Sequence, residues 1–186
     1  MSLNILKPET GKLLLSAPFL SDVFKRSVVY ITEHNDKGSL GFIINKPMKI
    51  KINDVIDDFP EFDADIYYGG PVQQEILNFF HKAGDKFNSG FELKDGLYWG
   101  GDFETLKLLI ETGELNPDDF RFFLGYAGWS PNQLEDELKI NSWIVNDSKL
   151  NDVFTGEPES LWQKILKEMG GEYSIISTFP ENPSVN

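Results

Sequence analysis

Cysteine is absent from the 186-residue chain. This absence excludes disulfide bonds, thiol nucleophiles and thiolate metal ligands, and it fits a protein of the reducing cytoplasm. Histidine is nearly absent too, because His34 and His81 are the only two. Each ends a predicted strand, where it would either shuttle a proton near neutral pH or bond to solvent or backbone. No ligand spacing joins them to carboxylates, so we expect no metal site.

Long apolar runs are also missing. No segment approaches the roughly 20 apolar residues that a membrane-spanning helix needs, and the N-terminus lacks the apolar core of a secretory signal. We therefore expect a soluble cytoplasmic chain without a membrane partner. The glycine pairs Gly69-Gly70 and Gly100-Gly101 match neither a dinucleotide fingerprint nor a phosphate-binding loop, so we expect no cofactor.

Positive charge is scarce as well, since the net charge is −13 and the pI is near 4.5. A surface this acidic repels a phosphate backbone, so direct binding of nucleic acid is disfavoured. One basic patch stands out, in which Lys46, Lys49 and Lys51 alternate with apolar residues. It is either the solvated face of a strand or loop, or a surface for nucleic acid or an acidic partner.

Arginine is as rare as histidine in this chain. Only Arg26 and Arg121 accompany 15 lysines. The planar guanidinium grips a carboxylate or phosphate with two parallel hydrogen bonds, so two isolated arginines in an acidic chain are candidates for an anion site. The alternative is that each forms an ion pair inside the fold. The two hypotheses differ in whether both guanidinium groups reach one cavity.

The pattern of apolar residues predicts an α+β fold, because hairpin strands come first and helices are interspersed later. Strands are expected at residues 12–17, 27–34, 40–45, 65–68, 76–81, 120–126, 141–145 and 173–178, and helices at 52–59, 103–112, 131–138 and 158–169. Asp102 is the expected N-cap of the second helix. No composition shift divides the chain, so residues 1–179 are predicted to form one domain, followed by a flexible tail at 180–186.

The most informative stretch runs from Phe120 to Trp143 and reads as a buried strand that breaks at glycines into a helix. Ser130 is its predicted N-cap, Pro131 occupies the first helical position, and Gln133 completes a capping box. Trp129 lies between a glycine and this cap, so we expect it to be partly exposed beside a concave surface formed by residues 125–133. An exposed tryptophan there would mark a docking or ligand-stacking surface.

The same stretch invites a comparison with hydrolases. Gly128-Trp129-Ser130 places a serine on a strand-to-helix turn, as a nucleophile elbow does, but the second glycine of the elbow is missing. Ser130 is better used as a cap, and no catalytic constellation is visible elsewhere. We therefore favour a protein that is not an enzyme.

Several ordered blocks of sequence carry a family resemblance. They are residues 11–18, 24–29, 33–34 with Gly38, 41–47, 69–72, and 123–129 with 133–137. On these blocks the chain resembles the YqgE/AlgH family of bacterial proteins over nearly its whole length. The resemblance implies a mixed or antiparallel sheet, bent strongly into a pseudo-barrel and flanked by helices. It implies no established activity, and the label of transcriptional regulator that some members carry names a genetic association.

These observations select seven candidate ligand-binding residues: Arg26, His34, Asn45, Arg121, Gly128, Trp129 and Ser130. The favoured hypothesis is a binding or regulatory module, with a cleft near residues 125–133 that takes a protein partner or a small anion. One alternative is a small-anion-binding enzyme or sensor, in which both arginines hold the ligand and His34 or Glu33 moves a proton. The other is a transcriptional regulator that contacts DNA through the lysine patch, which the acidic charge disfavours.

Overall fold

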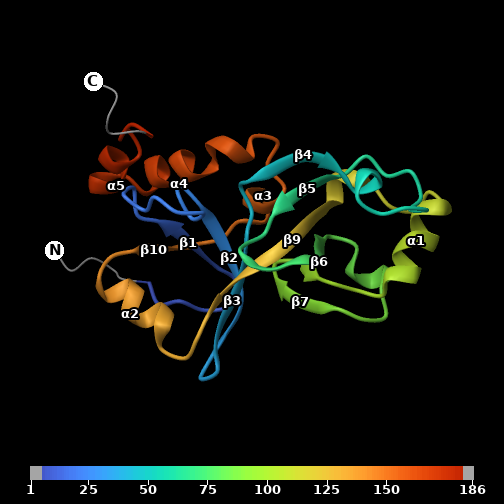
Figure 1. Cartoon of the computed structure of the whole chain (residues 1–186), viewed down its shortest axis with the longest axis horizontal. Coiled ribbons are helices and arrows are strands. Elements are labelled where there is room, and N and C mark those ends of the chain that lie inside the picture. The colour runs from blue at the N-terminus through green and yellow to red at the C-terminus, as the bar shows by residue number, and fades with distance from the viewer. Residues whose placement is uncertain (1–5, 182–186) are drawn as a thin grey trace.

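One long strand, β9 (Phe120–Trp129), joins the two parts of the sheet in the computed structural model, which describes residues 6–181 (Figure 1). Its first residues pair with antiparallel β6 (Val72–His81) and with parallel β5 (Asp65–Tyr68). Its last residues pair with antiparallel β3 (Gly38–Ile43). The remaining strands are β1 (Lys12–Ser16), β2 (Val28–Asn35), β4 (Pro47–Lys51), β7 (Phe91–Lys94), β8 (Leu97–Trp99) and β10 (Trp143–Asp147).

The sheet is open. Its strand order is β10-β1-β2-β3-β9-β6-β8-β7, with β4 and β5 branching from β9, and its two end strands, β10 and β7, do not pair with each other within residues 6–181. The α+β class is therefore confirmed, whereas the pseudo-barrel implied by the family resemblance is wrong. The reason lies in β9, because its two ends pair with different strands and the two parts extend away from it without closing.

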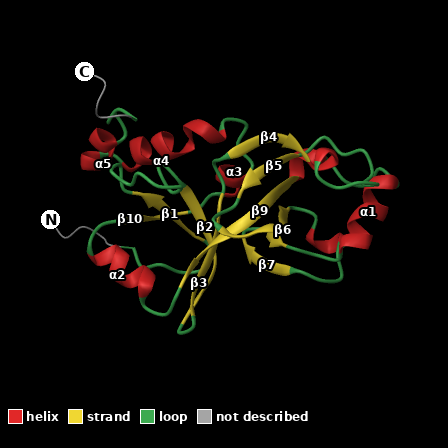
Figure 2. Cartoon of the chain, in the orientation of Figure 1, coloured by secondary structure: helices red, strands yellow, loops and turns green. Residues whose placement is uncertain are grey.

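Short helices flank the sheet (Figure 2). They are α1 (Phe103–Glu111), α2 (Gln133–Lys139), α3 (Leu150–Val153), α4 (Leu161–Met169) and α5 (Gly171–Ile176). Helices α4 and α5 lie on the side of β1 and β2, whereas α1 lies at the far end. No helix within the described residues is long and apolar enough to cross a membrane.

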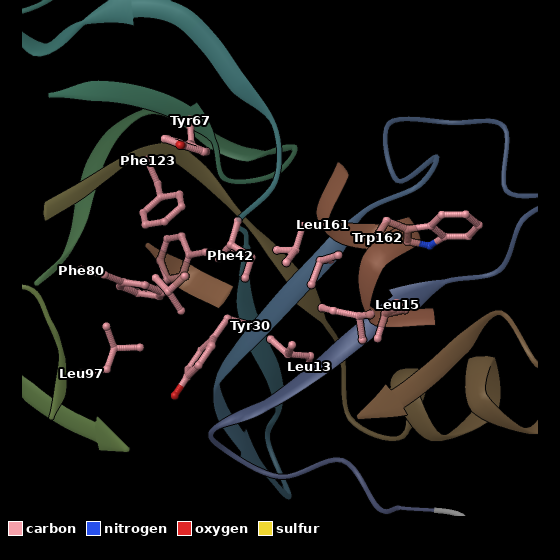
Figure 3. Close-up of a cluster of buried hydrophobic side chains, with 14 of the residues drawn as sticks. Leu13, Leu15, Tyr30, Phe42, Tyr67, Phe80, Leu97, Phe123, Leu161 and Trp162 are labelled. Carbon is pink, nitrogen blue, oxygen red and sulfur yellow. The ribbon is translucent and has the colours of Figure 1, made fainter. Parts of the chain in front are cut away.

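The largest apolar cluster lies between α4 and the central strands (Figure 3). Phe42 and Phe80 meet edge to face with ring centroids 5.2 Å apart, and Phe80 meets Phe123 at 4.9 Å. Trp162 of α4 is 1% exposed, and its indole N–H donates to the carbonyl oxygen of Ser16 at 3.0 Å. The hydrogen bond satisfies the polar atom of this buried ring and fixes α4 over β1.

Most predicted elements are confirmed at their expected places. The apolar runs at the N-terminus form the antiparallel strands β1, β2 and β3. Asp102 caps α1, because its Oδ2 accepts a hydrogen bond from the backbone N–H of Thr105 at 2.8 Å. Strand β10 and helix α4 also occur where the sequence predicts them, with shifts of a few residues at their starts.

Two predicted elements are wrong. The helix expected at residues 52–59 is a single 3-10 turn, Ile52–Asp54, because the Asn53 side chain bonds to the backbone of Phe59, Pro60 and Phe62 and fixes a loop. The strand expected at 173–178 is helix α5, in which Tyr173 and Ile176 pack on the main core at helical spacing. Of the tail expected at 180–186, only residues 180 and 181 are described.

Candidate functional site

Trp129 is buried, contrary to the sequence prediction. Its side chain is 6% exposed, and its Nε1–H donates to Oε2 of Glu137 at 2.9 Å. The indole N–H of Trp143 donates to the same oxygen at 2.7 Å. The two rings meet nearly edge to face with centroids 5.7 Å apart. Trp129 therefore anchors α2 to the sheet and offers no docking surface.

The turn after Trp129 also differs from its predicted form. Strand β9 continues through Gly125 and the exposed Gly128, and α2 begins only after Asn132, which has a left-handed φ of 63°. Ser130 is exposed and is not the N-cap. One half of the predicted capping box exists, because the Ser130 N–H donates to Oε1 of Gln133 at 2.9 Å. The extra turn at Asn132 delays the helix and leaves the serine hydroxyl outside it.

Arg26 and Asn45 hold a loop together. The Arg26 guanidinium donates to the carbonyl of Phe179 and lies over the ring of Trp162, 5.2 Å from its centroid. Asn45 is 5% exposed; its Oδ1 accepts from the N–H of Val28 at 2.8 Å and its Nδ2 donates to the Arg26 carbonyl at 2.9 Å. Both side chains are therefore engaged within the fold.

The histidines lie apart from each other. Nδ1 of His34 is 2.8 Å from the Ser39 hydroxyl, and its Nε2 is 3.6 Å from a carboxylate oxygen of Glu135, which links the β2–β3 hairpin to α2. His81 is 1% exposed, donates from Nε2 to the Gly100 carbonyl and accepts the N–H of Ala83 at Nδ1. Burial lowers the pKa of His81, so the fold holds its neutral form.

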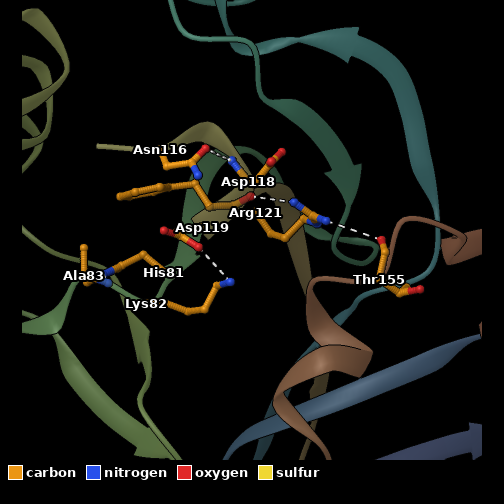
Figure 4. A network of polar contacts seen from close by, with 9 residues as sticks. His81, Lys82, Ala83, Asn116, Asp118, Asp119, Arg121 and Thr155 are labelled. Atoms are coloured by element: carbon orange, nitrogen blue, oxygen red, sulfur yellow. Dashed lines mark hydrogen bonds and ion pairs between the residues drawn. The ribbon is translucent and has the colours of Figure 1, made fainter. Parts of the chain in front are cut away.

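Arg121 is the predicted residue that faces a cavity. The pairing of β9 with β6 places it opposite Phe80, with its side chain on the face away from its buried neighbours. Its Nη1 donates to the carbonyl of Phe120 at 2.9 Å and its Nη2 donates to that of Thr155 at 3.3 Å (Figure 4). The guanidinium carbon lies 5.7 Å from the ring centroid of Tyr67. Its Nε–H is buried without a partner in the described residues.

The cavity beside this side chain, which we name the Arg121 hollow, has a volume of about 830 Å³. This volume lies within the range of small-ligand sites. Four segments line it: Pro47, Lys49 and Lys51 of β4; Asp63, Ala64, Asp65 and Tyr67; Pro117, Asp118 and Arg121; and the loop of residues 155–160.

Charges of both signs surround the Arg121 hollow. Lys51 lies between Asp63 and Asp65, with N–O distances of 2.8 and 2.7 Å, and these hydrogen bonds raise its pKa. Lys49 is exposed, has a left-handed φ of 60° and forms no ion pair within residues 6–181. Burial raises the pKa of Tyr67, and the adjacent positive charge of Arg121 offsets part of that rise.

The seven predicted ligand-binding residues therefore do not form one site. Arg121 alone among them lines the hollow, whereas Arg26 ends on a backbone carbonyl and a ring, so the two arginines do not converge. Residues 125–133 line neither this hollow nor a second one of about 520 Å³ beside Phe59 and Ile110. Within the described residues, no group of three or more histidine, aspartate or glutamate side chains could hold a metal ion.

Sequence reasoning missed the other walls of the hollow. The sequence predicts Tyr67 only as part of a strand. It predicts the acidic pair Glu157 and Glu159 only as the start of a helix. The one available signal is composition, because Gly156 and Pro158 flank Glu157 and leave only a single 3-10 turn, Pro158–Ser160, in this segment.

Comparisons with known proteins match nearly the whole chain. A UPF0301 protein of Cytophaga hutchinsonii is 47% identical over 179 residues, which cover 95% of this chain and 98% of that protein. A UPF0301 protein of Chlorobaculum parvum is 46% identical over 179 residues and 96% of each chain.

Solved structures share the fold. The solution structure of the AlgH protein from Pseudomonas aeruginosa has a TM-score of 0.73 and 29% identity, covering 92% of this chain and 94% of that one. A crystal structure from Corynebacterium diphtheriae has a TM-score of 0.78 and 24% identity, covering 96% of each chain. The family model described as AlgH-like matches residues 13–174. The chain therefore belongs to the AlgH-like family.

Proposed function

We propose that the chain is a non-enzymatic binding or regulatory module of the cytoplasm, and that its ligand enters the Arg121 hollow. The observation that carries this proposal is a guanidinium that faces an open cavity and forms no ion pair within residues 6–181. Its partners are two carbonyl oxygens and the rings of Tyr67 and Phe154. The hollow replaces residues 125–133 as the proposed cleft, because those residues line no described cavity.

The basic groups of the hollow suit an anionic group on the ligand. Carbonyl oxygens and aromatic rings orient a guanidinium without cancelling its charge, so Arg121 retains its attraction for a carboxylate or phosphate. Lys49 adds a second unpaired charge to the same cavity. A ligand's anionic group would therefore meet two cationic side chains, one of them held rigidly.

The absence of a catalytic arrangement from the described walls supports binding without chemistry. Neither histidine lines the hollow. The Ser160 hydroxyl donates to the carbonyl of Glu157, and the Thr155 hydroxyl accepts the N–H of the same residue, so neither is paired with a base. The alternative enzyme or sensor needs both arginines on one ligand, and Arg26 is engaged elsewhere.

Direct binding to DNA would need the lysine patch to join Lys25 and Arg26 in one basic stripe. Lys46 instead donates to the carbonyl of Val23, and Lys51 is held between two aspartates. A chain with a net charge of −13 would also repel the duplex. A role in transcription, which the family label suggests, would therefore act through a protein partner or a small ligand.

A thermal-shift screen of carboxylates and inorganic phosphate tests the proposal. A ligand at 100 times its Kd stabilises the fold by about 2.7 kcal/mol, so true ligands raise the Tm measurably. We expect the shift in the wild type, a reduced shift in Lys49→Gln and none in Arg121→Ala. Lys37→Gln removes the same charge from the exposed β2–β3 turn and serves as the matched control. Equal shifts in all four proteins would refute the proposed site.

A further inference from the structure

The unpaired charges around the Arg121 hollow come from several segments. Arg121 comes from β9 and the free Lys49 comes from β4. Glu157 and Glu159 come from the loop of residues 155–160, and Asp118 lies beside Arg121 (Figure 4). None of these three carboxylates forms an ion pair within residues 6–181. The hollow therefore presents two unpaired cations and three unpaired carboxylates.

This balance favours a ligand that carries both signs over a ligand that carries only one. A polyanion would satisfy the cations but would meet three carboxylates, and a purely cationic ligand would leave the guanidinium facing another positive charge. Like charges brought close together cost free energy, so the best ligand carries both signs. Lys51 adds no free positive charge, because its two aspartates already surround it.

The backbone that borders the hollow belongs to an edge strand. β4 pairs only with β5 among the described strands, and its alternate residues Pro47, Lys49 and Lys51 line the cavity. The β4–β5 pairing is irregular between Pro47 and Lys51, where Lys49 has its left-handed φ. A peptide that fills the hollow contacts these side chains, and where it extends past β4 it can also reach the free backbone groups of this edge strand.

We propose that the Arg121 hollow recognises a short extended peptide segment of a partner protein, in which an acidic and a basic side chain lie close in sequence. The acidic group contacts Arg121 and Lys49, the basic group contacts Glu157 and Glu159, and the peptide backbone lies across the hollow toward β4. This inference rests on the proposed function, and it adds the chemistry of the ligand to it.

Titration by two-dimensional ¹H–¹⁵N NMR with three blocked pentapeptides tests the inference. Their sequences are Ala-Lys-Gly-Glu-Ala, Ala-Glu-Gly-Glu-Ala and Ala-Lys-Gly-Lys-Ala, so length and backbone are constant while charge varies. We expect the mixed-charge peptide to bind at least tenfold more tightly than either of the others. The double variant Glu157→Gln/Glu159→Gln should reverse this preference toward the acidic peptide, whereas Glu172→Gln, at an exposed position of α5, should not change it.

The outcomes separate the two proposals. Equal or tighter binding of the acidic peptide to the wild type, lost in Arg121→Ala, would overturn the mixed-charge inference and leave the proposed function standing. Binding of carboxylates in the thermal-shift screen without binding of any peptide would overturn the peptide as the ligand class. Peptide binding that Arg121→Ala leaves unchanged would contradict both.

Discussion

The Glu137 carboxylate anchors α2 through two buried tryptophans, and its removal should be costly. Glu137→Ala leaves the indole N–H groups of Trp129 and Trp143 without an acceptor, although their side chains are only 6% and 5% exposed. A buried donor that loses its partner costs about 1–3 kcal/mol. Two such donors predict a loss of about 2–6 kcal/mol in the free energy of unfolding, which is a large share of the stability of an ordinary domain.

Urea denaturation followed by tryptophan fluorescence measures this loss. Glu137→Gln keeps one carbonyl oxygen that can accept both indole groups, so it should recover more than half of the lost stability. Glu75→Ala removes an exposed carboxylate of β6 and should change the free energy of unfolding by less than about 0.5 kcal/mol. A Glu137→Ala variant as stable as Glu75→Ala would refute the role of this carboxylate.

Three further predictions concern the interior. Asn45→Ala leaves a buried backbone N–H and a carbonyl unpaired, so urea denaturation should show a loss of about 2–6 kcal/mol, and an unchanged midpoint would contradict this. Burial lowers the pKa of His81 from 6.5, so the unfolded state takes up a proton at a higher pH than the folded state. The stability from this residue should therefore be complete above about pH 6.5 and decrease below it. In denaturation measured as a function of pH, His81→Gln should weaken that decrease. Gly70→Ala places a Cβ 2.2 Å from the Tyr126 backbone, so it should yield little folded protein by circular dichroism, and a wild-type Tm would refute the close approach.

Local sequence signals predicted the strands better than the overall shape. The apolar runs of β1, β2 and β3 and the Asp102 cap depend on neighbouring residues, so they are readable in sequence. Residues 173–178 carry strand-type side chains, but packing of Tyr173 and Ile176 on the core selects a helix there. Whether the sheet closes depends on the distant partners of β9, which no local pattern encodes.

The candidate site was predictable only in part. The rarity of arginine drew attention to Arg121, and the structure places this residue on a cavity wall. The prediction for Trp129 is wrong, because a loop position predicts exposure only when the hydrogen-bond acceptor eight residues further on, Glu137, is left out of account. Four segments far apart in the chain form the Arg121 hollow, so its shape and its mixed charge follow from the tertiary fold alone.

The most direct test of a binding site at the Arg121 hollow is the map of amide shift changes when the mixed-charge peptide is added to ¹⁵N-labelled protein. The changes should cluster at residues 47–51 and 155–160 and disappear in Arg121→Ala. Changes that cluster at residues 125–133, or that persist in Arg121→Ala, would contradict the account.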